Sequence, residues 1–201
     1  MKYHKNSKYL FIFVAFVILT FVPIAFHVNY SGGIVEFDNL YRGLKEVDRR
    51  EDSFLKFISS GENSCEFLLE KLAVENNALI KCDIIEIIGY IKCSNCQDEL
   101  VPFLNDPNWR VRFFTVDVLG KLKHEKLFTL LPKIILKDPN ERVKIGAIIA
   151  LGKCGNEKDV RFLEKLAAEK EYQGNKLIKA INMALTRLRS KLPITTKTSD
   201  C

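Results

Sequence analysis

A seven-residue frame occurs twice in this chain. The first copy, DPNWRVR, occupies residues 106–112, and the second, DPNERVK, occupies residues 138–144. Each copy continues in register to a second shared element, LGK, at residues 119–121 and 151–153. A fixed period in this range is the sequence signature of stacked helical repeats. The frame therefore predicts an all-α solenoid.

Weaker copies of the repeat flank the two central ones. Residues 80–89 align with residues 111–120 of the first central copy, and residues 177–185 align with residues 143–151 of the second. The helical spacing of the apolar residues predicts about four helix pairs. We place these pairs at about residues 64–91, 98–122, 126–154 and 158–192.

Each central frame opens with an aspartate followed by a proline. An aspartate side chain can cap the first N–H groups of a helix, and proline is well tolerated as the first helical residue. The proline also ends the preceding helix. We therefore expect Asp106 and Asp138 to cap the second helices of their units, with Pro107 and Pro139 as the first helical residues.

Three glycines occupy one position of the repeat. They are Gly89, Gly120 and Gly152, one in each of three successive units. Glycine has no side chain, so we expect adjacent helices to approach closely there. A bulky side chain at such a contact would overpack it.

The frame Asp-Pro-x-x-Arg-Val-Arg/Lys, followed by Ala-Leu-Gly at 150–152, resembles HEAT repeats, especially the short HEAT-like units first associated with phycobilin lyases. The resemblance covers about residues 64–192. It implies an α-solenoid whose second helices line a concave face, a surface commonly used to hold a protein partner. It does not imply lyase activity, since these repeats occur in many unrelated proteins.

The second helices carry apolar residues at positions that a HEAT-like unit would turn toward its concave face. A contiguous exposed apolar patch generally marks a protein or membrane contact. The alternative is that tight curvature, or residues 36–58 folding across the face, buries these side chains. The candidate partner-binding residues are Phe113, Val116, Ile145, Ile148 and Ile149.

A basic residue repeats beside this set. Arg112 and Lys144 share one position of the repeat, and Lys81 falls there in the first unit. As candidate binding residues at the edge of the apolar surface, Arg112 and Lys144 would guide an acidic partner. In the proteins that this sequence resembles, such residues more often pair with the turn aspartates, here Asp106 and Asp138, and join successive repeats.

The N-terminal region predicts a membrane anchor. Residues 9–28 form an uninterrupted run without a charge, which is long enough to cross a bilayer as a helix. Lysines precede the run within residues 1–8, whereas residues 29–41 contain no Lys or Arg. This asymmetry predicts a cytoplasmic N-terminus and an extracytoplasmic repeat domain.

A cleaved signal peptide is the competing interpretation. Against it, the run exceeds the usual apolar core of about 7 to 15 residues, and residues 23–28 contain no clear small-x-small cleavage site. We assign residues 29–63 to a linker and N-terminal capping helices, and residues 193–201 to a disordered tail.

The overall charge does not favour a nucleic-acid partner. The chain has 31 Lys and Arg against 25 Asp and Glu, and three of the lysines precede the apolar run. A nucleic-acid surface usually gathers many basic side chains on one face.

Six cysteines are present, and two of them form a CxxC motif at 93–96. A zinc site would need a second ligand pair, and the sequence has no second CxxC or CxxH. A thioredoxin-like redox pair expects an α/β setting, which this helical pattern does not supply. A local disulfide and two unpaired thiols remain as alternatives.

No residue set specifies a reaction. His124-Glu125 is the only His-Glu pair, whereas the HEAT-like deoxyhypusine hydroxylases use several such pairs to bind iron. Glycine-rich phosphate loops and GxSxG are absent from the sequence. We predict a membrane-anchored, non-catalytic HEAT-repeat scaffold that binds a protein partner and needs no metal or cofactor. The alternative is an accessory lyase or cofactor-handling protein of the phycobilin-lyase type.

Overall fold

The computed structural model confirms the predicted all-α fold class. It describes residues 33, 35–93, 96–172 and 175–192. Within these residues, every regular element is a helix. The chain divides into two compact units, residues 1–56 and residues 57–201.

The predicted membrane segment falls outside the part of the chain that can be described. This applies to the span at residues 9–28, to the basic flank at residues 1–8, and also to the tail at residues 193–201. Among the described residues, no helix combines the length and apolar character that crossing a bilayer requires.

The first unit contains a helical segment at residues 35–44 and the beginning of α2 (Arg50–Ser60). Leu44 is buried within it. Arg49 Nη1 donates to Glu46 Oε2 at 2.9 Å in the connection between the two helices. Residues 35–44 and 50–60, within the segment assigned to a linker and capping helices, are therefore helical.

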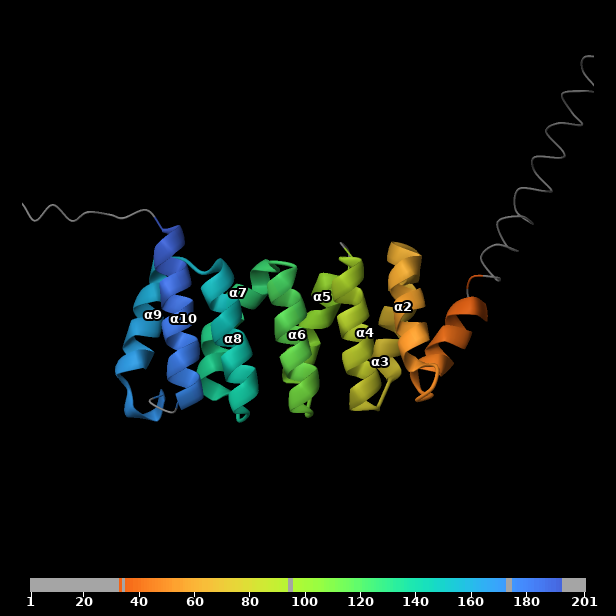
Figure 1. Cartoon of the computed structure of the whole chain (residues 1–201), viewed down its shortest axis with the longest axis horizontal. Coiled ribbons are helices and arrows are strands. Elements are labelled where there is room, and N and C mark those ends of the chain that lie inside the picture. The colour runs from red at the N-terminus through yellow and green to blue at the C-terminus, as the bar shows by residue number, and fades with distance from the viewer. Residues whose placement is uncertain (1–32, 34, 94–95, 173–174, 193–201) are drawn as a thin grey trace, which may run out of the picture. The chain divides into compact units, whose positions relative to one another are not determined.

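The second unit is a row of four helix pairs, as the repeat predicts (Figure 1). The first helix of each pair packs on the second, and α4, α6, α8 and α10 also pack on one another in succession. The pairs are α3 with α4, α5 and η2 with α6, α7 with α8, and α9 with α10. The elements are η1 (Gly61–Ser64), α3 (Cys65–Val74), α4 (Ala78–Ile91), α5 (Gln97–Leu100), η2 (Val101–Asn105), α6 (Trp109–Lys121), α7 (Glu125–Lys137), α8 (Glu141–Cys154), α9 (Glu157–Ala168), η3 (Lys170–Tyr172) and α10 (Asn175–Lys191).

The core of this unit lies between the first and second helices. On α7, Leu127, Leu131 and Ile135 recur once per helical turn and are completely buried. On α6, Val111 and Leu119 are equally buried. This spacing is that of helices with one apolar stripe turned toward the core.

The repeated glycines lie at close contacts between successive second helices, as predicted. Each has a side chain of the next second helix at the position that its own Cβ would need. A Cβ would lie 2.8 Å from Val118 Cγ2 at Gly89, 3.1 Å from Ala150 Cβ at Gly120, and 2.7 Å from both Cα and Cβ of Ala184 at Gly152. The small residues therefore set the distance between neighbouring repeats.

The turn before α6 differs from the predicted capping arrangement. Helix α6 begins at Trp109, and the side-chain oxygen of its N-cap, Asn108, accepts from Arg110 N–H at 2.9 Å. The prediction that Asp106 caps this helix, with Pro107 as its first residue, was wrong. Asp106 Oδ1 accepts from the backbone N–H of Asn108 at 2.8 Å, so the aspartate holds the turn and the asparagine caps the helix.

The turn before α8 repeats this arrangement, and the same correction applies to Asp138 and Pro139. Asn140 caps α8 by accepting from Arg142 N–H at 2.9 Å. Asp138 Oδ1 accepts from Asn140 N–H at 2.8 Å. Asparagine is as good an N-cap as aspartate, which leaves each aspartate with capacity to bind another group.

That other group is the basic side chain of the preceding second helix. Lys81 Nζ, on α4, donates to Asp106 Oδ2 at 2.7 Å. Arg112, on α6, donates to both oxygens of Asp138, from Nε at 2.8 Å and from Nη2 at 2.9 Å. Arg112 Nη1 also donates to the Asp106 carbonyl at 2.9 Å. The hydrogen bonds to Asp138 are the main reason that the pKa of Arg112 is raised.

The next contact in the series replaces the carboxylate with an aromatic ring. In the register of the last repeat, Tyr172 takes the position that Asp138 holds in the preceding one, and it is buried. Lys144 Nζ lies 5.7 Å from the centroid of its ring, within the range of a cation–π interaction. We call the three contacts Lys81–Asp106, Arg112–Asp138 and Lys144–Tyr172 the turn ladder.

We expect Gly152→Ala to destabilise the protein, although alanine favours helix by about 1 kcal/mol over glycine. The new Cβ would lie 2.7 Å from backbone and side-chain atoms of Ala184. Helix α10 would have to move, and overpacking of this kind costs about 1 to 3 kcal/mol. Urea unfolding measures the change in free energy.

Gly120→Ala is the matched control. Its Cβ would meet the side chain of Ala150 at 3.1 Å, with the Ala150 backbone 4.0 Å away. We expect a smaller loss than for Gly152→Ala. An equal or greater loss in the control would contradict the assignment of closest approach to Gly152.

Candidate partner-binding face

Two of the predicted apolar contact residues are buried. Val116 and Ile148 are equivalent residues of α6 and α8, and both have no exposed surface. The reason is the close packing of successive second helices: a Cβ on Gly146 would lie 3.1 Å from the Phe113 ring and 4.0 Å from Val116 Cγ1. Val116 and Ile148 therefore cannot contact a partner, and the prediction is corrected for both.

The other three apolar candidates are partly accessible. Phe113 and Ile145 are half-buried, and Ile149 is 40% exposed. The Phe113 ring packs edge-on against Phe114, with the centroids 5.7 Å apart. A partner contact through Phe113, Ile145 and Ile149 stays a prediction.

The basic candidates belong to the turn ladder. Arg112 is only 9% exposed, because it is held between the turn at Asp106 and that at Asp138. Its predicted place at the edge of a binding surface is therefore wrong, and the interpretation as an inter-repeat contact is confirmed. Lys144 is half-buried and lies over the ring of Tyr172.

A regular set of accessible side chains lies on the second helices. Each helix contributes two residues that are one turn apart, and the same two repeat positions are used throughout. We call this set the second-helix face. It consists of Glu86 and Tyr90 on α4, Asp117 and Lys121 on α6, Ile149 and Lys153 on α8, and Met183 and Arg187 on α10.

The first of these positions changes from acidic to apolar along the row. It holds Glu86 on α4 and Asp117 on α6, where Lys121 Nζ pairs with Asp117 Oδ2 at 2.7 Å. It holds Ile149 on α8 and Met183 on α10, and Met183 is 70% exposed. At this first position, the face therefore has an acidic end on α4 and α6 and an apolar end on α8 and α10.

The charged groups at the acidic end act on one another. Partial burial raises the pKa of Glu86, Asp83 and Asp117 raise it further, and Lys121 opposes the shift. The pKa of Lys121 is also raised, chiefly by its hydrogen bond to Asp117. A basic group on a partner would be attracted to this end of the face.

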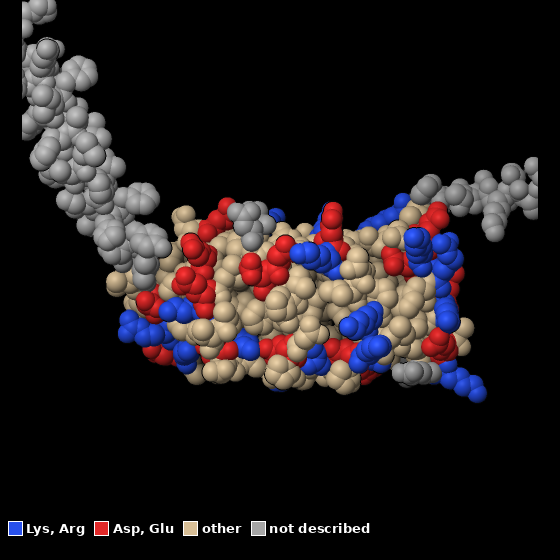
Figure 2. Space-filling model, turned by 180° about the vertical axis from the view of Figure 1, so that it is seen from behind, with Lys and Arg blue, Asp and Glu red and all other residues tan. Residues whose placement is uncertain are grey.

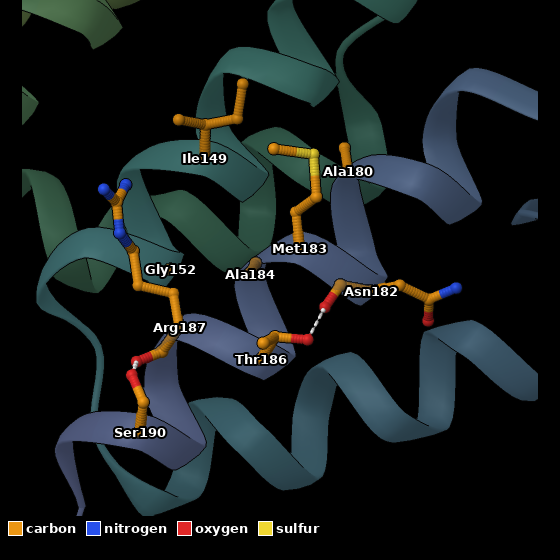
Figure 3. Close-up of a pocket in the computed structure, with 9 residues that line it drawn as sticks. All are labelled: Ile149, Gly152, Ala180, Asn182, Met183, Ala184, Thr186, Arg187 and Ser190. Carbon is orange, nitrogen blue, oxygen red and sulfur yellow. Dashed lines mark hydrogen bonds between the residues drawn. The ribbon is translucent and has the colours of Figure 1, made fainter.

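The apolar end borders a hollow of about 630 Å³ between α8 and α10 (Figure 3). Ile149 and Met183 line it together with small residues, among them Gly152 and Ala184, and with polar residues of α10, among them Asn182. The Arg187 guanidinium reaches along its edge. The hollow thus brings the apolar side chains of Ile149 and Met183 beside a basic group.

Sequence reasoning missed Met183 and Arg187. The register of the last repeat aligns Met183 with Ile149, and Arg187 with Lys153. Extending the position of Ile149 through this weaker repeat would have included Met183. Arg187 would have been missed even so, because its counterpart Lys153 was not a candidate residue.

Figure 2 shows the distribution of charged side chains on the side of the molecule that faces away from the viewer in Figure 1. There, Lys and Arg are interspersed with Asp and Glu over the described residues. This mixture differs from the gathered basic side chains of a nucleic-acid surface.

Two further groups of side chains do not belong to the second-helix face. His124 Nε2 and Lys126 Nζ lie 2.9 and 2.8 Å from Asp98 Oδ1, and hydrogen bonds from Lys126 and His124 lower the pKa of Asp98. In the described part of the chain, the group with metal-ligand spacing is formed by Cys65, Cys93 and Cys96. Two of its sulfur atoms are joined in a disulfide.

Comparison with known proteins agrees with the helix pairs. The model of HEAT repeats matches residues 65–135 and 98–183, which together make up more than half of the chain. No curated protein matches the chain. The family match covers the repeat units and gives no support to the phycobilin-lyase alternative. The chain therefore belongs to the HEAT-repeat family.

Proposed function

We propose that this protein is a membrane-anchored HEAT-repeat scaffold that binds another protein through the second-helix face, without catalysing a reaction. HEAT repeats commonly mediate protein interactions, and the chain belongs to that family. The observation that carries the proposal is the exposure of Ile149 and Met183 side by side at the apolar end of the face.

The side chains of the face define the kind of partner it would fit. Ile149 and Met183 border a hollow large enough for an apolar side chain. Methionine suits such a contact because its flexible side chain adapts to different shapes. Lys153 and Arg187 lie one turn further along the same helices. We infer a partner segment with an apolar anchor residue beside an acidic one.

A photo-crosslinking side chain placed at Met183 tests this proposal in cells that contain the protein naturally. We expect a discrete crosslinked product between this protein and its partner. Met183→Asp in a chain that carries the crosslinker at Ile149 should reduce that product by about tenfold or more, because a charge replaces buried apolar contact.

The matched control places the crosslinker at Leu136. Leu136 is an apolar residue of α7 with 47% exposure and does not belong to the second-helix face. It should give no corresponding product. Equal products from Leu136 and Met183 would show that exposure alone, and not this face, determines the crosslink.

The proposed anchor rests on the apolar run at residues 9–28, with basic residues before it. An uncharged segment of this length, coiled as a helix, matches the thickness of a bilayer core. The excess of lysine at the N-terminal flank supports a cytoplasmic N-terminus and an extracytoplasmic repeat domain. This location would present the second-helix face to partners outside the cytoplasm.

Fractionation and protease protection of the full chain with a C-terminal tag test the anchor. We expect the full-length protein in the membrane fraction after carbonate washing, with the tag protected from protease added on the cytoplasmic side. Deletion of residues 9–28 should release the protein from the membrane. A soluble, shortened product from the undeleted chain would identify a cleaved signal peptide and contradict the anchor.

A further inference from the structure

Three cysteine sulfurs meet in the first helix pair of the second unit. Cys65 is the first residue of α3, and Cys93 and Cys96 flank the connection that follows α4. Their sulfur atoms all lie within 4.8 Å of one another. All three residues are buried, with at most 6% exposure. The fold therefore brings Cys65 to a motif that lies beyond the whole of α4 in the sequence.

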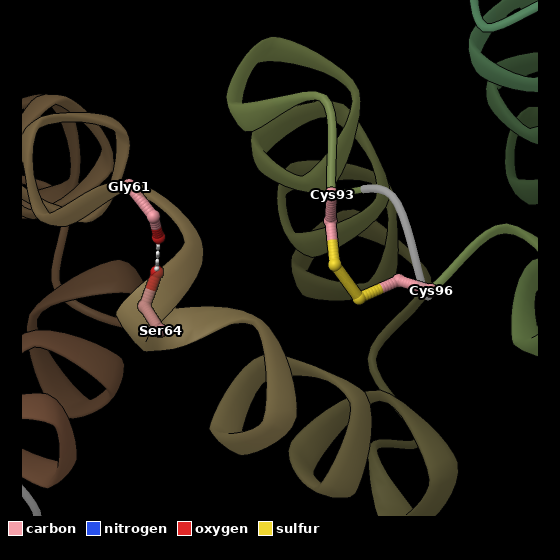
Figure 4. The surroundings of a disulfide bond; sticks show 4 residues. All are labelled: Gly61, Ser64, Cys93 and Cys96. Carbon is pink, nitrogen blue, oxygen red and sulfur yellow. Dashed lines mark hydrogen bonds between the residues drawn. A yellow bond between two sulfur atoms is a disulfide. The ribbon is translucent and has the colours of Figure 1, made fainter.

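The three sulfurs are chemically unequal. Cys93 and Cys96 form a disulfide, whereas Cys65 is a free thiol. Figure 4 shows the disulfide near the turn that leads into α3, where the Ser64 hydroxyl donates to the Gly61 carbonyl at 2.9 Å. This hydrogen bond holds the residue immediately before Cys65. The Cys65 thiol is thus held beside the disulfide in the buried interior of the protein.

We propose that Cys65 exchanges with this disulfide, so that the three sulfurs share one bond among them. The Cys65 thiol loses its proton, and its thiolate attacks the sulfur of Cys93 or Cys96. The new S–S bond forms as the old one breaks, and the displaced sulfur leaves as a thiolate and takes up a proton. One thiol and one disulfide are present before and after the exchange, so no external oxidant or reductant is consumed.

The exchange would change what the disulfide holds together. The Cys93–Cys96 bond joins residues only three apart, within one connection. A bond from Cys65 to either partner would join the start of α3 to the connection after α4. A disulfide that closes a longer loop restricts the unfolded chain more strongly. The alternative pairing would therefore close a longer loop. It would also link the start of α3 to the end of α4 across the first repeat.

The buried position of Cys65 limits how readily exchange occurs. Burial, with a smaller contribution from Glu62, raises the pKa of the Cys65 thiol to about 11. The thiol is therefore protonated at neutral pH, and the thiolate is the form that attacks disulfides. Such a thiol and disulfide can stay side by side and exchange slowly.

The test is disulfide mapping of the full chain after equilibration in a glutathione redox buffer. Acid quenching, alkylation of free thiols in denaturant and digestion without reductant reveal each pairing by mass spectrometry. We expect peptides that link Cys65 to Cys93 or Cys96 in addition to the Cys93–Cys96 peptide. A matching loss of the alkylated Cys65 peptide should accompany them.

The Cys96→Ser variant gives a second test. It removes one sulfur of the cluster, so Cys65 can form a disulfide within the cluster only with Cys93. We expect Cys65–Cys93 to become its main disulfide. Cys82 is a matched control, since it is a buried thiol of α4 outside the cluster, and Cys82→Ser should leave the pairing of the three cysteines unchanged. Circular dichroism checks that each variant folds.

Full alkylation of Cys65 in both the wild-type chain and a folded Cys96→Ser variant would overturn the proposal. If that variant fails to fold, the wild-type result decides alone. A reduced wild-type chain that binds one zinc ion through the three thiolates, and never forms a Cys65 disulfide, would assign the cluster to metal binding and also overturn it.

Discussion

The paired charges of Arg112 and Asp138 connect one repeat of this protein to the next. The guanidinium donates two hydrogen bonds to the carboxylate and a third to the carbonyl of Asp106, so one side chain joins two successive turns. Both side chains are nearly buried, at 11% and 7% exposure. A pair in this setting is strongly destabilising to break, because removal of one partner leaves a buried charge. The pair therefore helps to fix how α6 and α8 lie beside each other.

The glycines determine which side chains remain accessible once the repeats are aligned. Because the second helices pack closely, with Gly146 against Phe113 and Val116, the side chains of Val116 and Ile148 are fully buried. The accessible residues are then those on the outer side of each helix. Ile149 and Met183 are exposed for this reason, and their position supports the proposed binding of a protein partner.

The sequence predicted the features that depend on periodicity. The spacing of the two frames predicted the helix pairs, and the repeated glycines predicted close contacts between second helices. The burial of Val116 could not be predicted in this way, because it depends on the distance between neighbouring helices. The choice of Asn108 over Asp106 as N-cap was also missed, because the frame offers both residues and either type can cap a helix.

The cysteine cluster is another feature that the sequence predicted only in part. The CxxC spacing left a local disulfide and two free thiols open, and the structure contains the disulfide. The approach of Cys65 to that disulfide depends on the packing of α3 near the connection after α4. No local pattern in the sequence records such a contact.

A double-mutant cycle on Arg112→Met and Asp138→Asn tests the central claim that the turn ladder couples successive repeats. We predict a coupling free energy of at least about 1.5 kcal/mol from urea unfolding, as expected for buried hydrogen bonds between charged groups. The exposed pair of Lys121 and Asp117 serves as the reference cycle and should give about 0.2 to 1 kcal/mol. A coupling for Arg112 and Asp138 no larger than this reference would contradict the claim.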